Sequence, residues 1–213
     1  GLFAFSIFWV SLLLMSAQVV SAQMIPNPGF EQMDYCPVSF NQKKMRLIKG
    51  WGQPTDGTPD YYHSCSKKVG VPGNIFGHQE AHSGEAYIGL ITFNPSKRDY
   101  REYLEGSLSK PLEKGQLYCV KFYFSLADNS TFASDGIGVL FHEEPNEKRG
   151  NQLLERHAQV RNPASNVLKN DSDWVELSLV YRGGGNEKYL SIGNFRRDDS
   201  LIIHKRMLGN IEG

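Results

Sequence analysis

The stretch Leu117-Tyr118-Cys119-Val120-Lys121-Phe122-Tyr123-Phe124 carries the clearest structural signal in this sequence. From Tyr118 onward, core-forming residues at the even-numbered positions alternate with Cys119, Lys121 and Tyr123 at the odd-numbered ones. Successive side chains of a strand point to opposite faces, so one face should join a core and the other should be mixed polar and aromatic. The pattern predicts a long β-strand over residues 116–127.

Shorter runs of the same kind recur along the chain and are separated by turn formers, since the sequence holds 21 Gly and 10 Pro. Further strands are predicted at 45–51, 85–93, 102–109, 136–142, 174–182, 188–195 and 200–204. Only residues 151–160 have the pattern of a short helix. About eight strands at this spacing predict an all-β fold, an antiparallel β-sandwich whose commonest form in exported recognition modules is the jelly roll.

Residues 1–22 are predicted to be a signal peptide. They carry no charge, contain an apolar run from Phe8 to Met15, and end in Val20-Ser21-Ala22, so cleavage is expected before Gln23. A membrane anchor is the alternative, but the apolar run is shorter than the roughly 20 residues that span a bilayer. The sequence has no initiator Met and is expected to begin inside the signal. Residues 23–213 are predicted to form one domain without a further membrane span.

The charge balance argues against nucleic-acid binding. Lys and Arg number 23, Asp and Glu also number 23, and the formal net charge is zero. Nucleic-acid binders draw much of their affinity from clustered basic residues on phosphates. We therefore expect no nucleic-acid binding by this protein.

Three cysteines raise the question of a disulfide in an exported chain. Cys36 and Cys65 lie in loop-like sequence, whereas Cys119 lies inside the long predicted strand. We therefore predict a Cys36–Cys65 bridge and a free Cys119. Reduced or metal-bound cysteines are the alternative, although no Cys-x-x-Cys spacing indicates zinc.

Several motifs, in this order, resemble those of galactose-binding-like jelly rolls, which include many carbohydrate-binding modules. They are Asn27-Pro28-Gly29-Phe30-Glu31, Gly50-Trp51, His82-Ser83-Gly84-Glu85-Ala86-Tyr87 and Trp174. A closer resemblance is to the amino-terminal domain of OmpA-like envelope proteins of Bacteroidota-type bacteria. It is carried by Thr58-Pro59-Asp60-Tyr61-Tyr62, Tyr100-Arg101-Glu102-Tyr103, Ser125-Leu126-Ala127-Asp128-Asn129-Ser130 and Ile192-Gly193-Asn194-Phe195.

This resemblance implies an exported binding module of the periplasm, outer membrane or cell surface. The family usually continues through a final Tyr-x-Ile-Asp-Asp-Val strand into a peptidoglycan-binding domain, and the residues after Asp198-Asp199 do not match that strand. The domain is therefore expected to be truncated at its carboxy-terminal end, with peptidoglycan bound only through a downstream domain absent here. The resemblance also implies Glu31 as a ligand of structural calcium. A surface carboxylate or a turn-stabilising acceptor is the alternative for Glu31.

Aromatic residues are the predicted ligand-binding groups. Those expected in loops or on the outer face, together with one basic neighbour, are Trp51, Tyr61, Tyr62, Tyr100, Arg101, Tyr103 and Tyr123. Flat rings stack on the apolar faces of sugars while polar neighbours bind the hydroxyls. Core packing is the alternative role for these residues.

Catalytic motifs are lacking. The sequence has no Gly-x-Ser-x-Gly elbow and no glycine-rich phosphate loop. His78-Gln79-Glu80-Ala81-His82 is not a His-Glu-x-x-His motif; a loop in which His82 forms local hydrogen bonds is favoured over a strand that holds a metal. We therefore predict a non-catalytic module that binds glycans, with structural or adhesive contacts to envelope proteins as the alternative and hydrolysis third.

Overall fold

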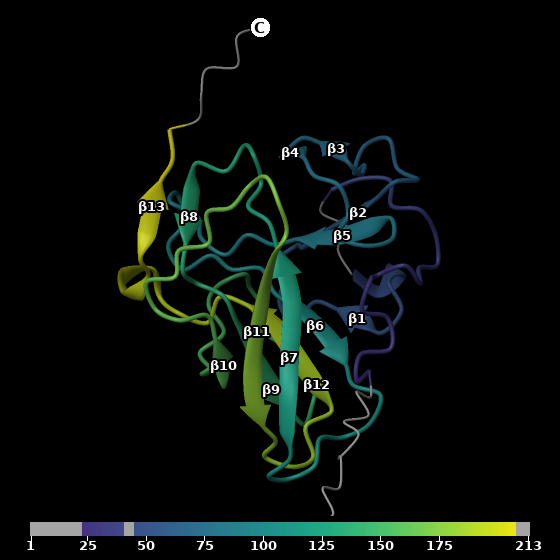
Figure 1. Cartoon of the computed structure of the whole chain (residues 1–213), viewed down its shortest axis with the longest axis vertical. Coiled ribbons are helices and arrows are strands. Elements are labelled where there is room, and N and C mark those ends of the chain that lie inside the picture. The colour runs from purple at the N-terminus through teal and green to yellow at the C-terminus, as the bar shows by residue number, and fades with distance from the viewer. Residues whose placement is uncertain (1–22, 41–44, 208–213) are drawn as a thin grey trace, which may run out of the picture.

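The computed structural model describes residues 23–40 and 45–207, and its regular elements are short strands joined by long loops (Figure 1). The fold is all-β, and every strand pair in the described residues is antiparallel. The predicted signal peptide, residues 1–22, lies outside the described residues.

The largest sheet has five strands in the order β1-β6-β12-β9-β10. In that order, their bounds are Trp51–Gly52, Leu104–Ser107, Tyr189–Gly193, Gly138–His142 and Val160–Arg161.

The second layer is the pair formed by β7 (Leu117–Phe124) and β11 (Val175–Arg182), each eight residues long. It lies in front of the five-stranded sheet in Figure 1. Tyr118, Val120 and Phe122 point toward the core while Cys119 and Lys121 are exposed. The alternation predicted from the sequence is therefore confirmed.

The main core fills the space between these two layers. Its buried members include Trp51 from β1, Leu104 from β6, Phe141 from β9, Leu190 from β12 and Tyr181 from β11. The rings of Phe141 and Tyr181 stack across the layers with centroids 4.4 Å apart. A smaller cluster comprises Tyr103, Leu140, Leu154, Ala158 and Phe195. Since Tyr103 and Leu140 are chain neighbours of core residues that face β7 and β11, this cluster lies on the opposite face of the large sheet.

Three short strand pairs and two 3₁₀ turns complete the described fold. The strand pairs are β2 (Asp60–His63) with β5 (Ala86–Gly89), β3 (Gly73–Asn74) with β4 (Gly77–His78), and β8 (Phe132–Ser134) with β13 (Ile203–Lys205). The turns are η1 (Met45–Leu47) and η2 (Asp198–Ser200).

Two sequence-based expectations about secondary structure are wrong. Residues 45–47 form η1 rather than a strand, because the Ile48 N–H bonds back to the Met45 carbonyl at 3.1 Å and closes a turn. Residues 151–160 form no helix, since their backbone groups bond to a distant segment. The Leu153 N–H donates to the Asp99 carbonyl at 2.9 Å, and the Asn151 carbonyl accepts from Arg101 N–H at 2.9 Å.

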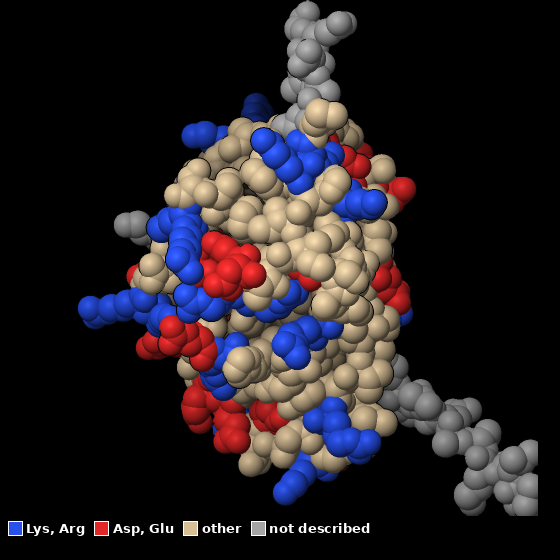
Figure 2. Space-filling view, turned by 90° about the vertical axis from the view of Figure 1, so that its left-hand side faces the viewer, with Lys and Arg blue, Asp and Glu red and all other residues tan. Residues whose placement is uncertain are grey.

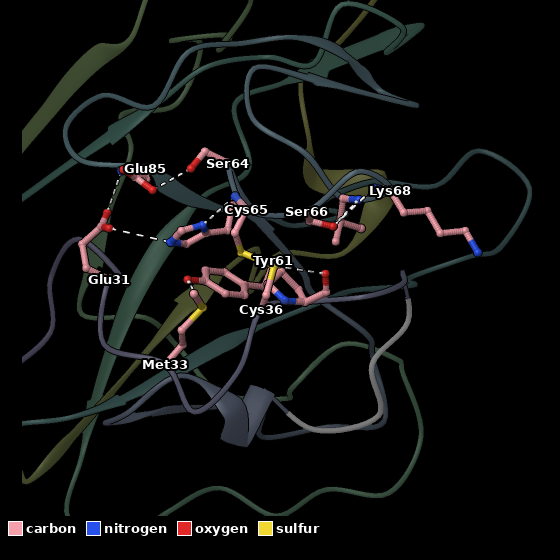
Figure 3. The surroundings of a disulfide bond; sticks show 12 residues. Glu31, Met33, Cys36, Tyr61, Ser64, Cys65, Ser66, Lys68 and Glu85 are labelled. Atoms are coloured by element: carbon pink, nitrogen blue, oxygen red, sulfur yellow. Dashed lines mark hydrogen bonds and ion pairs between the residues drawn. A yellow bond between two sulfur atoms is a disulfide. The ribbon is translucent and has the colours of Figure 1, made fainter.

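The disulfide joins Cys36 to Cys65, as predicted, with their Cα atoms 6.1 Å apart (Figure 3). Cys119 is a free, exposed thiol on β7. Across residues 23–40 and 45–207, no helix has the length and apolar character needed to cross a membrane.

Candidate functional site

Most of the predicted ligand-binding residues are buried, so the expectation that they are exposed in loops or on an outer face is wrong. Exposed fractions are 8% for Trp51, 4% for Tyr61, 3% for Tyr62 and zero for Arg101 and Tyr103. Both faces of β2 are covered. The Tyr61 hydroxyl donates to the Phe30 carbonyl at 2.9 Å, and Tyr62 stacks on Tyr87.

Trp51 and Tyr103 are structural anchors. The Trp51 indole N–H donates to the Asn27 carbonyl at 2.7 Å and ties the Asn-Pro-Gly-Phe-Glu motif to β1. The Tyr103 hydroxyl donates to the Asn194 carbonyl at 2.7 Å and accepts from the Leu154 N–H at 3.1 Å. The Trp51 indole N–H and the Tyr103 hydroxyl are therefore both hydrogen-bonded to backbone groups of the protein itself.

Arg101 joins two loops from inside the protein. Its guanidinium forms an ion pair with Asp198 at 2.8 Å and donates to the Arg196 carbonyl at 2.6 Å. A fully buried guanidinium is stable only when it is paired in this way. Arg101 thus holds the 196–198 segment in place and presents no group to a ligand.

Tyr100 is half-buried and lies beside a buried acid. Its hydroxyl donates to Glu102 at 2.8 Å, and the ammonium of Lys97 lies 4.8 Å from its ring centroid. Burial is the main cause that raises the pKa of Glu102 to about 7. The Tyr100 ring is thus engaged by Lys97 and its hydroxyl by Glu102.

Glu31, the predicted calcium ligand, has protein partners at both oxygens (Figure 3). One oxygen accepts the Glu85 N–H at 2.9 Å, and the other lies 4.0 Å from the His63 imidazole nitrogen. Gly84 permits this contact, because a Cβ there would collide with the Glu31 carboxyl. Calcium prefers six to eight oxygen ligands, so this donor set does not fit it. In the described part of the chain, no group of three or more His, Cys, Asp and Glu side chains could hold a metal ion.

Tyr123 is the one predicted ring that lies on an open face, and it belongs to an aromatic cluster. We define the ring surface as His82, Tyr87, Tyr123 and Trp174. His82 stacks on Tyr123 with centroids 3.6 Å apart, and Trp174 meets both His82 and Tyr87 edge-on at 6.3 and 5.7 Å. His82 is exposed and the other three are partly exposed. These contacts link the four rings in the order Tyr123, His82, Trp174 and Tyr87 into one platform.

Charged groups lie beside the platform on the outer face of β7 and β11. The Tyr123 hydroxyl donates to Glu176 at 2.9 Å, and the Lys121 ammonium lies 3.1 Å from the same carboxylate. These hydrogen bonds lower the pKa of Glu176, and the bond to Glu176 raises the pKa of Tyr123. The platform therefore combines ring faces with an ammonium and a carboxylate, which suits hydroxyl-rich ligands.

The 79–84 loop is fixed against this face by specific contacts. Trp174 donates its indole N–H to the Glu80 carbonyl at 2.7 Å, and Ser125 donates its hydroxyl to the Gln79 side chain at 2.7 Å. Residues 79–84 form a loop, as predicted. The ring of His82 stacks on Tyr123 and makes an edge contact with Trp174, whereas local hydrogen bonds were predicted for it. The buried ring of Tyr62 stacks on Tyr87 with ring centroids 5.1 Å apart.

Sequence reasoning missed Trp174, Tyr87 and His82 as members of the site. The register pairs Tyr123 with Glu176, so Trp174, two residues before Glu176, falls on the same outer face. That register could have been inferred from the matching alternation of the two strands. The position of His82 depends on a loop and has no such signal.

A buried polar cluster on the large sheet contains Ser191, His142 and Glu105. The imidazole Nε2 of His142 lies 3.0 Å from the Ser191 hydroxyl, while Nδ1 lies 2.7 Å from the Glu144 carbonyl. The Glu105 carboxylate lies on the Nε2 side, 3.4 Å away, so it does not orient Nδ1 as the acid of a catalytic triad does. Ser191 is fully buried and His142 is 3% exposed, and burial lowers the pKa of His142. The cluster satisfies buried polar groups and gives no access to a substrate.

Two shallow hollows adjoin β13, on the side of the molecule shown in Figure 2. One is lined by residues 165–167, 169 and 202–204, and the other by residues 93–96, 98, 198, 199 and 203. On this side, acidic and basic groups are interspersed next to a broad uncharged area (Figure 2). Arg98 illustrates the mixture, since it lies within 4 Å of both Asp99 and Asp199. Neither hollow is lined by a cluster of aromatic rings like that of the ring surface.

Comparison of the sequence with protein-family models and with curated proteins found no match.

Proposed function

We propose that this chain is a non-catalytic, exported binding module whose ring surface binds carbohydrate. The observation that carries the proposal is the platform of His82, Tyr87, Tyr123 and Trp174 beside Lys121 and Glu176. Aromatic rings offer a face to the C–H groups of a sugar, and flanking polar groups bind its hydroxyls. The platform lies on strands and a pinned loop, so little ordering is required on binding.

Two further observations support this proposal. The Cys36–Cys65 disulfide is typical of an oxidising compartment and so supports export. The two layers of antiparallel strands agree with a β-sandwich, and we take the jelly-roll form and the role as an OmpA-like envelope domain from the sequence resemblance.

Protein contact is the second candidate function, because the same outer face also exposes aliphatic side chains. Val180 is 69% exposed on β11 and Leu117 is 52% exposed on β7. The register places Leu117 and Val180 diagonally across the two strands, and neighbouring apolar groups are a feature of interaction surfaces. It adjoins the free thiol of Cys119, whose strand partner is Val180.

The test is a screen of the protein on an array of bacterial and plant oligosaccharides, followed by the paired change Tyr123→Ala and Trp174→Ala. We expect binding by the parent protein and its loss in the pair. Tyr35→Ala is the matched control, since Tyr35 is a 58% exposed ring outside the ring surface. If no oligosaccharide binds, and Val180→Asp abolishes capture of an envelope protein, the contact function replaces this proposal.

A further inference from the structure

β11 is an edge strand of the front layer. Its eight residues pair with β7 along their whole length, and no other described strand is bonded to it. β10 lies near β11, but it belongs to the large sheet, where it pairs with β9. An edge strand of this length presents a row of unpaired N–H and C=O groups, which is a template for a further strand.

The hydrogen-bond pattern shows which residues of β11 point these groups outward. The Gly183 N–H donates to the Gln116 carbonyl at 2.9 Å, directly beyond the pair of Arg182 with Leu117. Opposite residues of an antiparallel pair alternate between bonded and non-bonded, so Arg182 and every second residue before it face away from β7. These outward-facing residues are Glu176, Ser178, Val180 and Arg182. Among the described residues, no backbone group outside the β7–β11 pair bonds to them.

The side chains of the four outward-facing residues lie on the solvent side of the front layer. All four are exposed, and Val180 is exposed to 69%. Leu177 and Tyr181, which alternate with them, are buried in the core face. A strand added at this edge would therefore extend the outer face of the layer without disturbing the core.

The charges of β11 are complementary to a second copy of the same strand. When two β11 strands run antiparallel about a two-fold axis at Leu179, Glu176 of each copy lies opposite Arg182 of the other. Ser178 lies opposite Val180 in the same arrangement, and the outward N–H and C=O groups form bonded pairs at all these positions. Opposite charges at directly opposed positions stabilise a strand pair.

The free edge of β7 has no such pattern. Its outward-facing residues alternate in the same way and include Lys121 as their one charged side chain. A two-fold axis at Val120 would set Lys121 against Cys119 and Leu117 against Tyr123. The charge pattern therefore favours β11 as the edge that meets a second copy.

Both charged groups of β11 have capacity for this contact. Within the described residues, the Tyr123 hydroxyl and the Lys121 ammonium both contact Oε2 of Glu176, so Oε1 is available to a partner. Arg182 donates from Nη1 to the Gly115 carbonyl at 2.9 Å, and a guanidinium has five N–H donors. The ion pair with a second copy thus adds to these contacts and does not require them to break.

We propose that β11 is a homodimer interface, at which two copies join edge to edge into a four-stranded antiparallel layer. The two ring surfaces then lie on the same outer face, so the dimer presents two sites to one long ligand. One strand pair is a small interface, so the dimer is weak and forms at high protein concentration. The dimer holds or fails independently of whether the ring surface binds a glycan.

The test uses the protein with Cys119→Ala, which prevents an intermolecular disulfide at this exposed thiol. Sedimentation from about 10 µM to about 1 mM, where weak interfaces associate, should show a monomer–dimer equilibrium. Amide hydrogen exchange of the four outward-facing residues should slow at the higher concentration. The amides of Leu177 and Leu179 should change less, because they already bond to β7 in the monomer.

Charge exchange then assigns the register. Glu176→Lys and Arg182→Glu each set like charges opposite one another, and each should raise the dimer Kd about tenfold or more. The double variant restores opposite charges and should regain the dimer. Lys67→Glu, at an exposed position in the loop after β2, is the control and should leave Kd unchanged.

Three results would overturn the proposal. One is a protein that stays monomeric at the highest concentration. Another is slowed exchange that is confined to strands other than β11. The third is a dimer that both single charge variants leave intact, since the register about Leu179 predicts that each of them weakens it.

Discussion

The imidazole of His82 stacks on the ring of Tyr123 with centroids 3.6 Å apart and planes inclined by 19°. This contact fastens the 79–84 loop to β7, and it covers one face of the Tyr123 ring. Exposed ring pairs contribute about 0.5–1.5 kcal/mol beyond their buried area. His82→Ala should therefore destabilise the protein only slightly but raise amide hydrogen exchange in the 79–84 loop. Unchanged exchange in that loop would show that the stack does not hold it.

Removing the Tyr103 hydroxyl should be costly. Tyr103→Phe leaves the Asn194 carbonyl and the Leu154 N–H without their partner in a buried site. A buried unsatisfied group costs on the order of 1–3 kcal/mol, which chemical denaturation measures directly. Tyr35→Phe, at an exposed position, is the control and should change the free energy of unfolding by less than about 0.5 kcal/mol.

Stability should fall as the pH rises through the window set by Glu102. The folded protein holds this carboxyl at a pKa of about 7, above its ordinary 4.5, so it binds more protons than the unfolded chain between these values. The contribution is fully present below about pH 4.5 and is lost by about pH 7, a change of roughly 3 kcal/mol. Glu102→Gln should flatten this part of the stability profile. A profile that is the same in both proteins would contradict the assignment.

The disulfide should contribute measurably to stability, because it closes a loop with a sequence separation of 29. The entropy lost by the unfolded chain corresponds to about 3–4 kcal/mol. Replacing Cys36 and Cys65 together by Ala should lower the free energy of unfolding by that order, measured with urea. Cys119→Ala should have little effect, since this thiol is free and exposed. Equal losses in both variants would argue against a specific role of the bridge.

Local patterns in the sequence were sufficient for the longest strands. The alternation in 117–124 and 175–182 is a property of each strand alone, and the structure pairs the two with their apolar faces inward. Short strands such as β3 and β4, with two residues each, carry too few side chains to show a period. η1 has three residues, which are likewise too few to show a period, so it could be mistaken for the start of a strand.

The site was harder to predict because exposure depends on contacts between distant segments. Tyr61 and Tyr62 look alike in the sequence, and both are buried because Phe30 and Met33 cover one side of β2 while Tyr87 covers the other. The ring surface joins Trp174 to Tyr123 and His82, which come from three separate parts of the chain. Only the register of β7 against β11 brings the first two together.

The central claim is that the ring surface binds carbohydrate, and an NMR titration with the best-bound oligosaccharide tests it most directly. The signals of Trp174 and Tyr123 should shift first and most strongly. Trp174→Ala should raise Kd at least about tenfold, which corresponds to roughly 1.4 kcal/mol. Shifts confined to other parts of the protein, together with an unchanged Kd in Trp174→Ala, would contradict the account.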